Sequence, residues 1–326
     1  MNAIIHDVDS VTSLSCVEEF TKHTGTILAL PFAVEKDTKL KEELLDFLKE
    51  LSQEEWVILL IDPRISYKTV AEFELPKVHI LRLSLPKDSL CSFPLFLSDK
   101  EGNQVVGAVF PFASSPRLRR EILLELSIAR YGREGLPFAL PSYSVLFDGE
   151  NRALVDTTYL KGASLEEVKL LLKETLNLND VLFFFPLYES KGEIKRYLSL
   201  VDKKKLVVNP AYLKKEVIPQ LSDCGYTLLL MPRQVGADSY TSFYTNDTTL
   251  YFPLYQKLED EEALKEITEF VGDSKKILPI PVSSTRYIGH TFASYFTYIP
   301  YSPKIEIEPR EEVSTHQFYK EEKKRG

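Results

Sequence analysis

The sequence has 326 residues, 44% of them hydrophobic, which is enough to bury a large core. Its formal net charge of −8 disfavours nucleic acid as a partner, because duplex-binding proteins usually carry a basic face. The three cysteines, Cys16, Cys91 and Cys224, are far apart, which argues against a disulfide framework or a cysteine-rich zinc site.

The first ten residues have no basic segment followed by an apolar one, so we expect no signal peptide and a cytoplasmic protein. Apolar runs such as 56–61 and 181–187 are too short to cross a bilayer, and we expect no membrane partner. No GxGxxG or Walker motif is present, and His6, Asp7 and Asp9 lack the further ligand spacing of a metal site. We therefore expect neither a cofactor nor a bound metal.

In chain order, the first predicted elements come from hydrophobic periodicity and β-prone runs. They are a strand at 26–30, a helix at 39–51, a strand at 56–61, strands at 94–97 and 105–110, a helix at 116–130 and a strand near 136–140.

The clearest unit follows at 143–187. Two strands joined by an Asp148-Gly149 turn precede a helix and an unbroken apolar strand at 181–185, as expected of a strand buried on both faces. Ser164 and Glu167 have the spacing of a capping box at the start of the helix. The order strand, strand, helix, strand then recurs at 195–231, with a helix at 211–221, and at 242–280, with a helix at 260–271.

The aromatic, β-prone segment 291–299 can supply the strand that the N-terminal unit lacks. We therefore predict five repeated units in a ring that strands from both ends of the chain close, which removes exposed sheet edges. An ordinary α/β protein with single alternation is the other interpretation. We expect one domain over 1–303 and a charged, flexible tail at 304–326.

The sequence resembles the agmatine deiminase family over most of its length. The segments that carry the resemblance are, in chain order, Leu95–Asp99 with Gly102; 140–149 with 156–160, similar to the family's LEGGSI…DG…T…LL; 192–202, which aligns with GHIDxxxxFVD; and 239–253, similar to YxNFLxxN…VPxY. The resemblance implies a pentein-type α/β propeller of the guanidino-group-modifying superfamily, with five ββαβ units around a pseudo-fivefold axis.

The family's chemistry implies specific groups at this axis. A cysteine thiolate attacks the central carbon of a guanidinium, a histidine moves protons, and carboxylates hold the planar cation. The chain departs from the family at the matching positions. Ser92 lies where the Arg-Asp pair of the WxRDxGP motif is missing, Ser142 and Tyr143 replace the two glycines of LEGG, Glu193 replaces the histidine of GHID, and Lys195 replaces its aspartate.

The family's nucleophile motif, GGxHCxTxxxP, is matched best by 289–300. Counting back from Pro300 puts Ser294 at the cysteine position, or Ala293 or Tyr295 if the loop has shifted. Loss of a nucleophile alone removes a factor of roughly 10⁶ in rate in worked enzyme cases. Lys195 adds a positive charge that repels a guanidinium where a carboxylate should hold it.

These departures predict a chain that is not an enzyme: a non-catalytic agmatine deiminase-like protein that acts as a binding or scaffold subunit. We expect it to pair with itself or with an active relative, because family members commonly form oligomers. The candidate ligand-pocket residues are Lys195, Glu193, Ser294, His290 and Tyr143.

Other interpretations remain open. Lys195 and Arg196 could line an anion pocket, although we expect Lys195 to pair with Glu193 or to reach solvent. A divergent hydrolase could use Ser294 with His290 and Glu193 as base, and Cys91 could be a displaced nucleophile, although a packed thiol is the better expectation. A pure interaction module is the last alternative, by analogy of fold with the ribosome anti-association factor.

Overall fold

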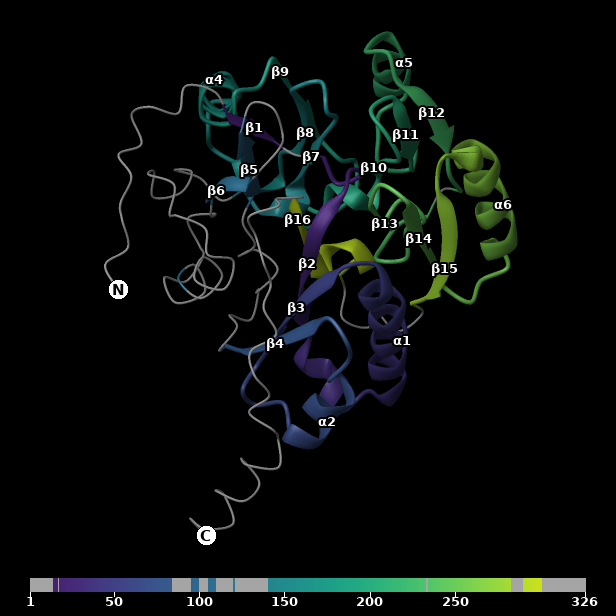
Figure 1. Cartoon of the computed structure of the whole chain (residues 1–326). Helices are drawn as coiled ribbons and strands as arrows, with labels where there is room; N and C mark the ends of the chain where they lie inside the picture. Colours follow the sequence, from purple (N-terminus) through teal and green to yellow (C-terminus); the bar gives the residue numbers. More distant parts are fainter. Residues whose placement is uncertain are drawn as a thin grey trace.

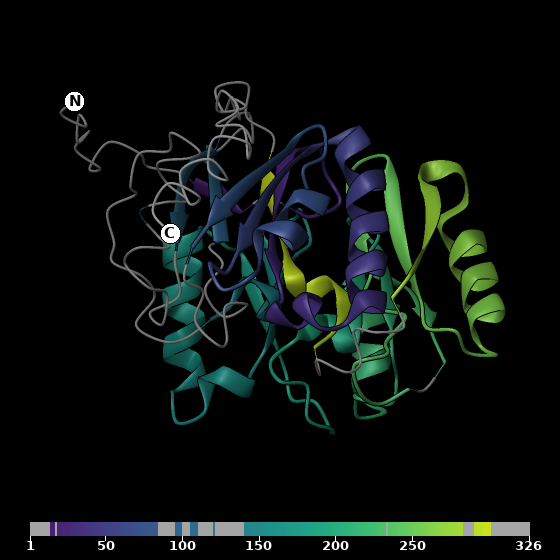
Figure 2. The same cartoon turned by 90° about the horizontal axis from the view of Figure 1, so that it is seen from below.

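The computed structural model describes residues 14–16, 18–83, 95–99, 105–109, 120, 140–232, 234–282 and 290–300. Their strands form five sheets that are arranged around a common centre, with helices toward the outside (Figure 1). Turned by 90°, the molecule shows α4 and α6 at opposite edges and α1 between them (Figure 2).

Three of the sheets repeat one pattern: an antiparallel pair, a helix, and a third strand parallel to the second. They comprise β7 (Val145–Phe147), β8 (Arg152–Asp156), α4 (Leu165–Leu176) and β9 (Asp180–Phe184); β10 (Leu198–Leu200), β11 (Lys205–Val208), α5 (Val217–Asp223) and β12 (Thr227–Leu230); and β13 (Tyr244–Thr245), β14 (Thr249–Leu254), α6 (Asp260–Val271) and β15 (Lys276–Pro281). The predicted repeat is confirmed.

The ring is closed by strands from distant parts of the chain, as predicted. In the fourth sheet, β16 (Phe296–Pro300) pairs antiparallel with β2 (His23–Leu30), which is parallel to β3 (Trp56–Ile61). The sequence did not predict the next two elements, α2 (Tyr67–Glu72) and the added strand β4 (Val78–Arg82). Both are short, so hydrophobic periodicity has little length over which to repeat.

The fifth sheet contains β5 (Leu95–Asp99) between β6 (Val105–Val109) and β1 (Leu14–Cys16). The sequence analysis missed β1, whose three residues pair with a strand far along the chain. The predicted strand 136–140 and helix 116–130 lie outside the described residues, apart from residues 140 and 120, and so does the tail 304–326.

The helix predicted at 211–221 is shorter and later, since α5 covers Val217–Asp223. Pro219 explains the difference. It is tolerated in the first turn of α5, whereas in a helix that began at 211 it would remove an interior hydrogen bond to residue 215.

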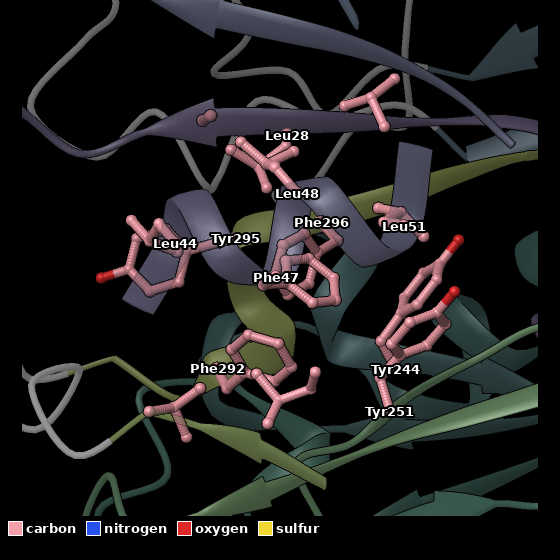
Figure 3. Close-up of a cluster of buried hydrophobic side chains, with 14 of the residues drawn as sticks. Leu28, Leu44, Phe47, Leu48, Leu51, Tyr244, Tyr251, Phe292, Tyr295 and Phe296 are labelled. Atoms are coloured by element: carbon pink, nitrogen blue, oxygen red, sulfur yellow. The ribbon is translucent and has the colours of Figure 1, made fainter. Parts of the chain in front are cut away.

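Helix α1 (Thr38–Glu54) covers the closing sheet and anchors the largest core cluster (Figure 3). Asp37 caps it by accepting a hydrogen bond from the Leu40 backbone nitrogen at 3.0 Å. Phe47 is fully buried, with ring centroids 4.9 Å from both Phe292 and Phe296. The helix therefore packs directly on the segment that leads into β16.

No helix in the described part of the chain combines the length and apolar character needed to cross a membrane.

Candidate functional site

Two short 3-10 turns meet near the centre of the ring. The turn η6 (Ile194–Arg196) precedes β10, and η9 (Phe292–Tyr295) precedes β16. The sequence predicted plain strands at both places, over 195–201 and 291–299. Tight backbone bonds such as Arg196 N to Glu193 O, 3.0 Å, and Ser294 N to Thr291 O, 3.2 Å, replace the start of each strand.

Glu193 joins the two turns. Its side chain is almost completely buried, and its Oε1 lies 2.5 Å from His290 Nδ1. Its Oε2 accepts a hydrogen bond from the Thr291 backbone nitrogen at 2.9 Å and lies 3.0 Å from Arg196 Nε. Arg196 is buried as well, whereas the His290 side chain is 27% exposed. A buried carboxylate therefore holds an imidazole that reaches the surface.

Gly192 sets the direction of the chain into Glu193. It has a φ of 74°, and a Cβ there would lie 2.1 Å from the ring of Tyr159. Tyr159 in turn donates a hydrogen bond to the Lys191 carbonyl oxygen at 3.0 Å and lies 3.1 Å, oxygen to oxygen, from Tyr143. The positive φ and the close approach of Tyr159 therefore require glycine at this turn.

The Ser294 side chain bonds within its own turn. Its hydroxyl donates to the Thr291 carbonyl oxygen at 2.6 Å, and its side chain is not on the wall of the central cavity. The neighbouring Ala293 lines that cavity instead. Ala293 is the position that a shifted loop would align with the family's nucleophile, and its methyl side chain carries no reactive group.

The central cavity has a volume of about 50 Å³. Its wall includes Glu19, Ser142, Tyr143 and Lys195. This volume has room for only a few water molecules, whereas pockets for larger ligands measure about 300–1,000 Å³.

Lys195 pairs with Glu19, which corrects the expectation that it pairs with Glu193 or reaches solvent. Its Nζ donates to Glu19 Oε1 and to the Phe243 carbonyl oxygen, the latter at 3.0 Å. Burial lowers the pKa of Lys195, and the charge of Glu19 opposes that change. Because Glu19 compensates the ammonium, the cavity does not carry the uncompensated positive charge that the sequence argument assumed.

Glu19 lies on segment 18–22, which Lys275 holds from the other side. Lys275 Nζ donates to the Phe20 carbonyl oxygen at 3.1 Å and also to the Asn246 carbonyl oxygen. Burial lowers the pKa of Lys275 to about 8 from its usual value of 10.5.

Lys275 predicts a pH dependence of stability. Between pH 8 and 10.5 the unfolded state binds more protons than the folded state, so the free energy of unfolding should rise with pH in this window. Compared with Lys275→Met, the wild type should gain about 1–2 kcal/mol between pH 7 and 9.5, after a discount for partial exposure. Urea unfolding at both pH values measures the difference, and an equal pH response of both proteins would contradict it.

The structure places the other predicted site residues in two groups. Ser142, Tyr143 and Lys195 lie together on the cavity wall, and Glu193 and His290 form the adjoining pair. Ser92 and Cys91 lie outside the described residues. The sequence analysis missed Glu19, because a single acidic residue in an irregular segment gives no local signal. In the described ranges, no group of three or more His, Cys, Asp or Glu side chains could hold a metal.

Comparison with known proteins finds similarity in structure and none in sequence. No family model matches the sequence, and no curated protein does. The fold is similar to that of agmatine deiminase from C. jejuni, with a TM-score of 0.73, 14% identity, and 88% and 96% of the two chains covered. Agmatine deiminase from Enterococcus faecalis gives a TM-score of 0.71, 15% identity, and 92% and 99% coverage. An inosamine-phosphate amidinotransferase from Streptomyces griseus gives 0.52, 13% identity, and 93% and 99% coverage.

These likenesses confirm the predicted fold class, the pentein-type α/β propeller. They contradict the prediction that the chain is not an enzyme, because the structures that share its fold are agmatine deiminases, which are enzymes.

Proposed function

We propose that this chain, which has the pentein fold, is a hydrolytic enzyme that acts on a small molecule and uses His290 for proton transfer. The observation that carries the proposal is the 2.5 Å contact between the buried Glu193 carboxylate and Nδ1 of the partly exposed imidazole. A carboxylate in this position fixes the orientation and the tautomer of a histidine, as in other hydrolytic sites.

With Nδ1 bonded to Glu193, Nε2 is the ring nitrogen that remains for the substrate side. It would take a proton from water as the water oxygen adds to an electrophilic carbon of the substrate. The same proton would then pass to the leaving nitrogen or oxygen, so the histidine returns to its starting state. Attack by water supports this role better than a covalent intermediate, because the candidate for the family's nucleophile position that lines the cavity, Ala293, has no nucleophilic side chain.

The first substrates to test are guanidino compounds, because agmatine deiminases share the fold. Release of ammonia, citrulline or carbamoylputrescine should be measured with agmatine, arginine and methylated arginines. We expect His290→Asn to lower kcat/KM by about 10²–10⁴, the usual contribution of a positioned acid–base group.

The matched control is Glu269→Gln, at a side chain on α6 that is 69% exposed, and it should leave turnover unchanged. Wild-type turnover that survives in His290→Asn would remove the histidine from the mechanism. No product from any substrate of this panel with the wild-type protein would overturn the proposed activity.

Pairing with a second copy or with an active relative stays a prediction. Light scattering on the full chain, alone and mixed with an agmatine deiminase, tests it.

A further inference from the structure

The buried ammonium of Lys195, on the wall of the central cavity, is paired with a carboxylate from an irregular segment. Lys195 is 8% exposed, and its Nζ projects to the cavity side of η6, whereas Glu193 at the start of the same turn binds His290 and Arg196. Its only acidic contact within the described ranges is Glu19, which comes from outside the regular elements. The positive charge therefore depends on a carboxylate that a short irregular segment supplies.

Few contacts hold that carboxylate in place. Glu19 Oε1 accepts a hydrogen bond from Lys195 Nζ and a second, long one of 3.4 Å from the Thr245 backbone nitrogen. A buried ammonium needs an anion, because an unpaired buried charge is costly. A carboxylate that is not tethered to the chain can meet the same need if it reaches the cavity.

The cavity has the features of a site for a short carboxylic acid. Ser142 lines it, and the Ser142 hydroxyl is buried without a hydrogen-bond partner among the described residues, so it can donate to a carboxylate oxygen. The remaining wall is largely apolar and includes Phe96, Leu146 and Phe296. The volume of about 50 Å³ suits a molecule of only a few heavy atoms.

We propose that the central cavity binds a small monocarboxylate, whose carboxylate replaces the Glu19 side chain on Lys195 and whose short alkyl part lies against the apolar wall. The inference goes beyond the proposed function, since it assigns a ligand class to a cavity whose wall does not include His290. A dianion such as phosphate fits less well, because the neighbouring cation, Arg196, faces Glu193.

Binding to the full chain tests the proposal without any assay of turnover. Calorimetry and thermal unfolding should be followed with acetate, propionate and butyrate, against chloride at equal ionic strength. In Glu19→Gln the internal competitor is gone, so the affinity for these carboxylates should rise at least tenfold over the wild type. The same anions should raise the Tm of this variant in a concentration-dependent way.

Two further variants make the test specific. Lys195→Met should show no stabilisation by carboxylates. The double variant Lys195→Met, Glu19→Gln should show none either, and because it removes both members of the ion pair it leaves no unpaired buried charge that could cause misfolding. Glu18→Gln is the matched control, because Glu18 belongs to the same segment but lies against Gly149. The affinity of this variant for carboxylates should equal that of the wild type.

The proposal is overturned if Glu19→Gln shows no carboxylate-dependent stabilisation, or if Lys195→Met responds equally well. These results are separable from those on turnover. Binding that follows Lys195 in a protein without hydrolytic activity supports the carboxylate site and refutes only the hydrolase. Turnover that depends on His290 without any carboxylate binding refutes only the site.

Discussion

Glu193→Gln is expected to lower the free energy of unfolding by about 3–5 kcal/mol, the usual cost of breaking a buried ion pair from one side. The change leaves the buried Arg196 guanidinium facing an uncharged amide at the position where Glu193 Oε2 now lies 3.0 Å from Nε. It also weakens the hydrogen bond that the Thr291 nitrogen donates to the same oxygen. Urea unfolding followed by circular dichroism measures the loss.

The same substitution should lower kcat/KM by about 10²–10⁴, because His290 loses the group that orients it. This loss should appear under conditions in which the variant is still folded, as checked by its unfolding curve. A variant that is destabilised yet fully active would show that Glu193 is structural only.

A double-mutant cycle separates the ion pair from general damage to the core. Arg196→Met removes the charge that faces the Glu193 carboxylate, so the double variant should be more stable than the sum of the single losses predicts. Strictly additive losses would show that the two side chains do not depend on each other. Glu269→Gln, at an exposed carboxylate, should change stability by no more than about 0.5 kcal/mol.

Phe47→Ala is the second large expected effect, with a loss of about 3–5 kcal/mol in the free energy of unfolding. The ring is fully buried, and in Figure 3 it stands among the aromatic side chains of Phe292, Phe296 and Tyr251. Its centroid lies 5.5 Å from that of Tyr251, in an edge-to-face arrangement that adds to the burial of apolar surface.

Because Phe47 packs on the residues around η9, its loss should also loosen the segment that carries His290. Hydrogen exchange of the 290–296 amides should accelerate in Phe47→Ala more than that of β11, which belongs to another sheet. Lys49→Ala on the same helix is the control, since its side chain is about half exposed. A small stability loss in Phe47→Ala, close to that of the control, would contradict the packing argument.

At two places the structure differs from the elements that the local sequence pattern predicts. Apolar residues at 211–213 continued a helical pattern, yet Tyr212 and Leu213 are buried in a turn, where the Ala211 backbone nitrogen donates to Asn209 Oδ1 at 3.1 Å. At 194–196 and 292–295 the sequence has the β-prone residues of a strand, but the chain forms 3-10 turns. Tertiary hydrogen bonds, such as that from the Ala293 nitrogen to Ser242 Oγ at 2.9 Å, outweigh the local preference there.

The sequence by itself determined the repeated unit and the bounds of α6 and β3, because each depends on a periodicity that neighbouring residues carry. It also predicted that a C-terminal segment closes the ring, although the strand that does so, Phe296–Pro300, begins later than predicted. Tertiary structure alone decided which charged side chains meet. Glu193 reaches His290 across 97 positions, and Lys195 reaches Glu19 across 176. Two charged side chains pair when folding brings them close together, and closure of the ring determines which ones are close. The sequence therefore singled out Lys195 and Glu193 but could not supply the partners, Glu19 and His290, that the folded chain brings to them.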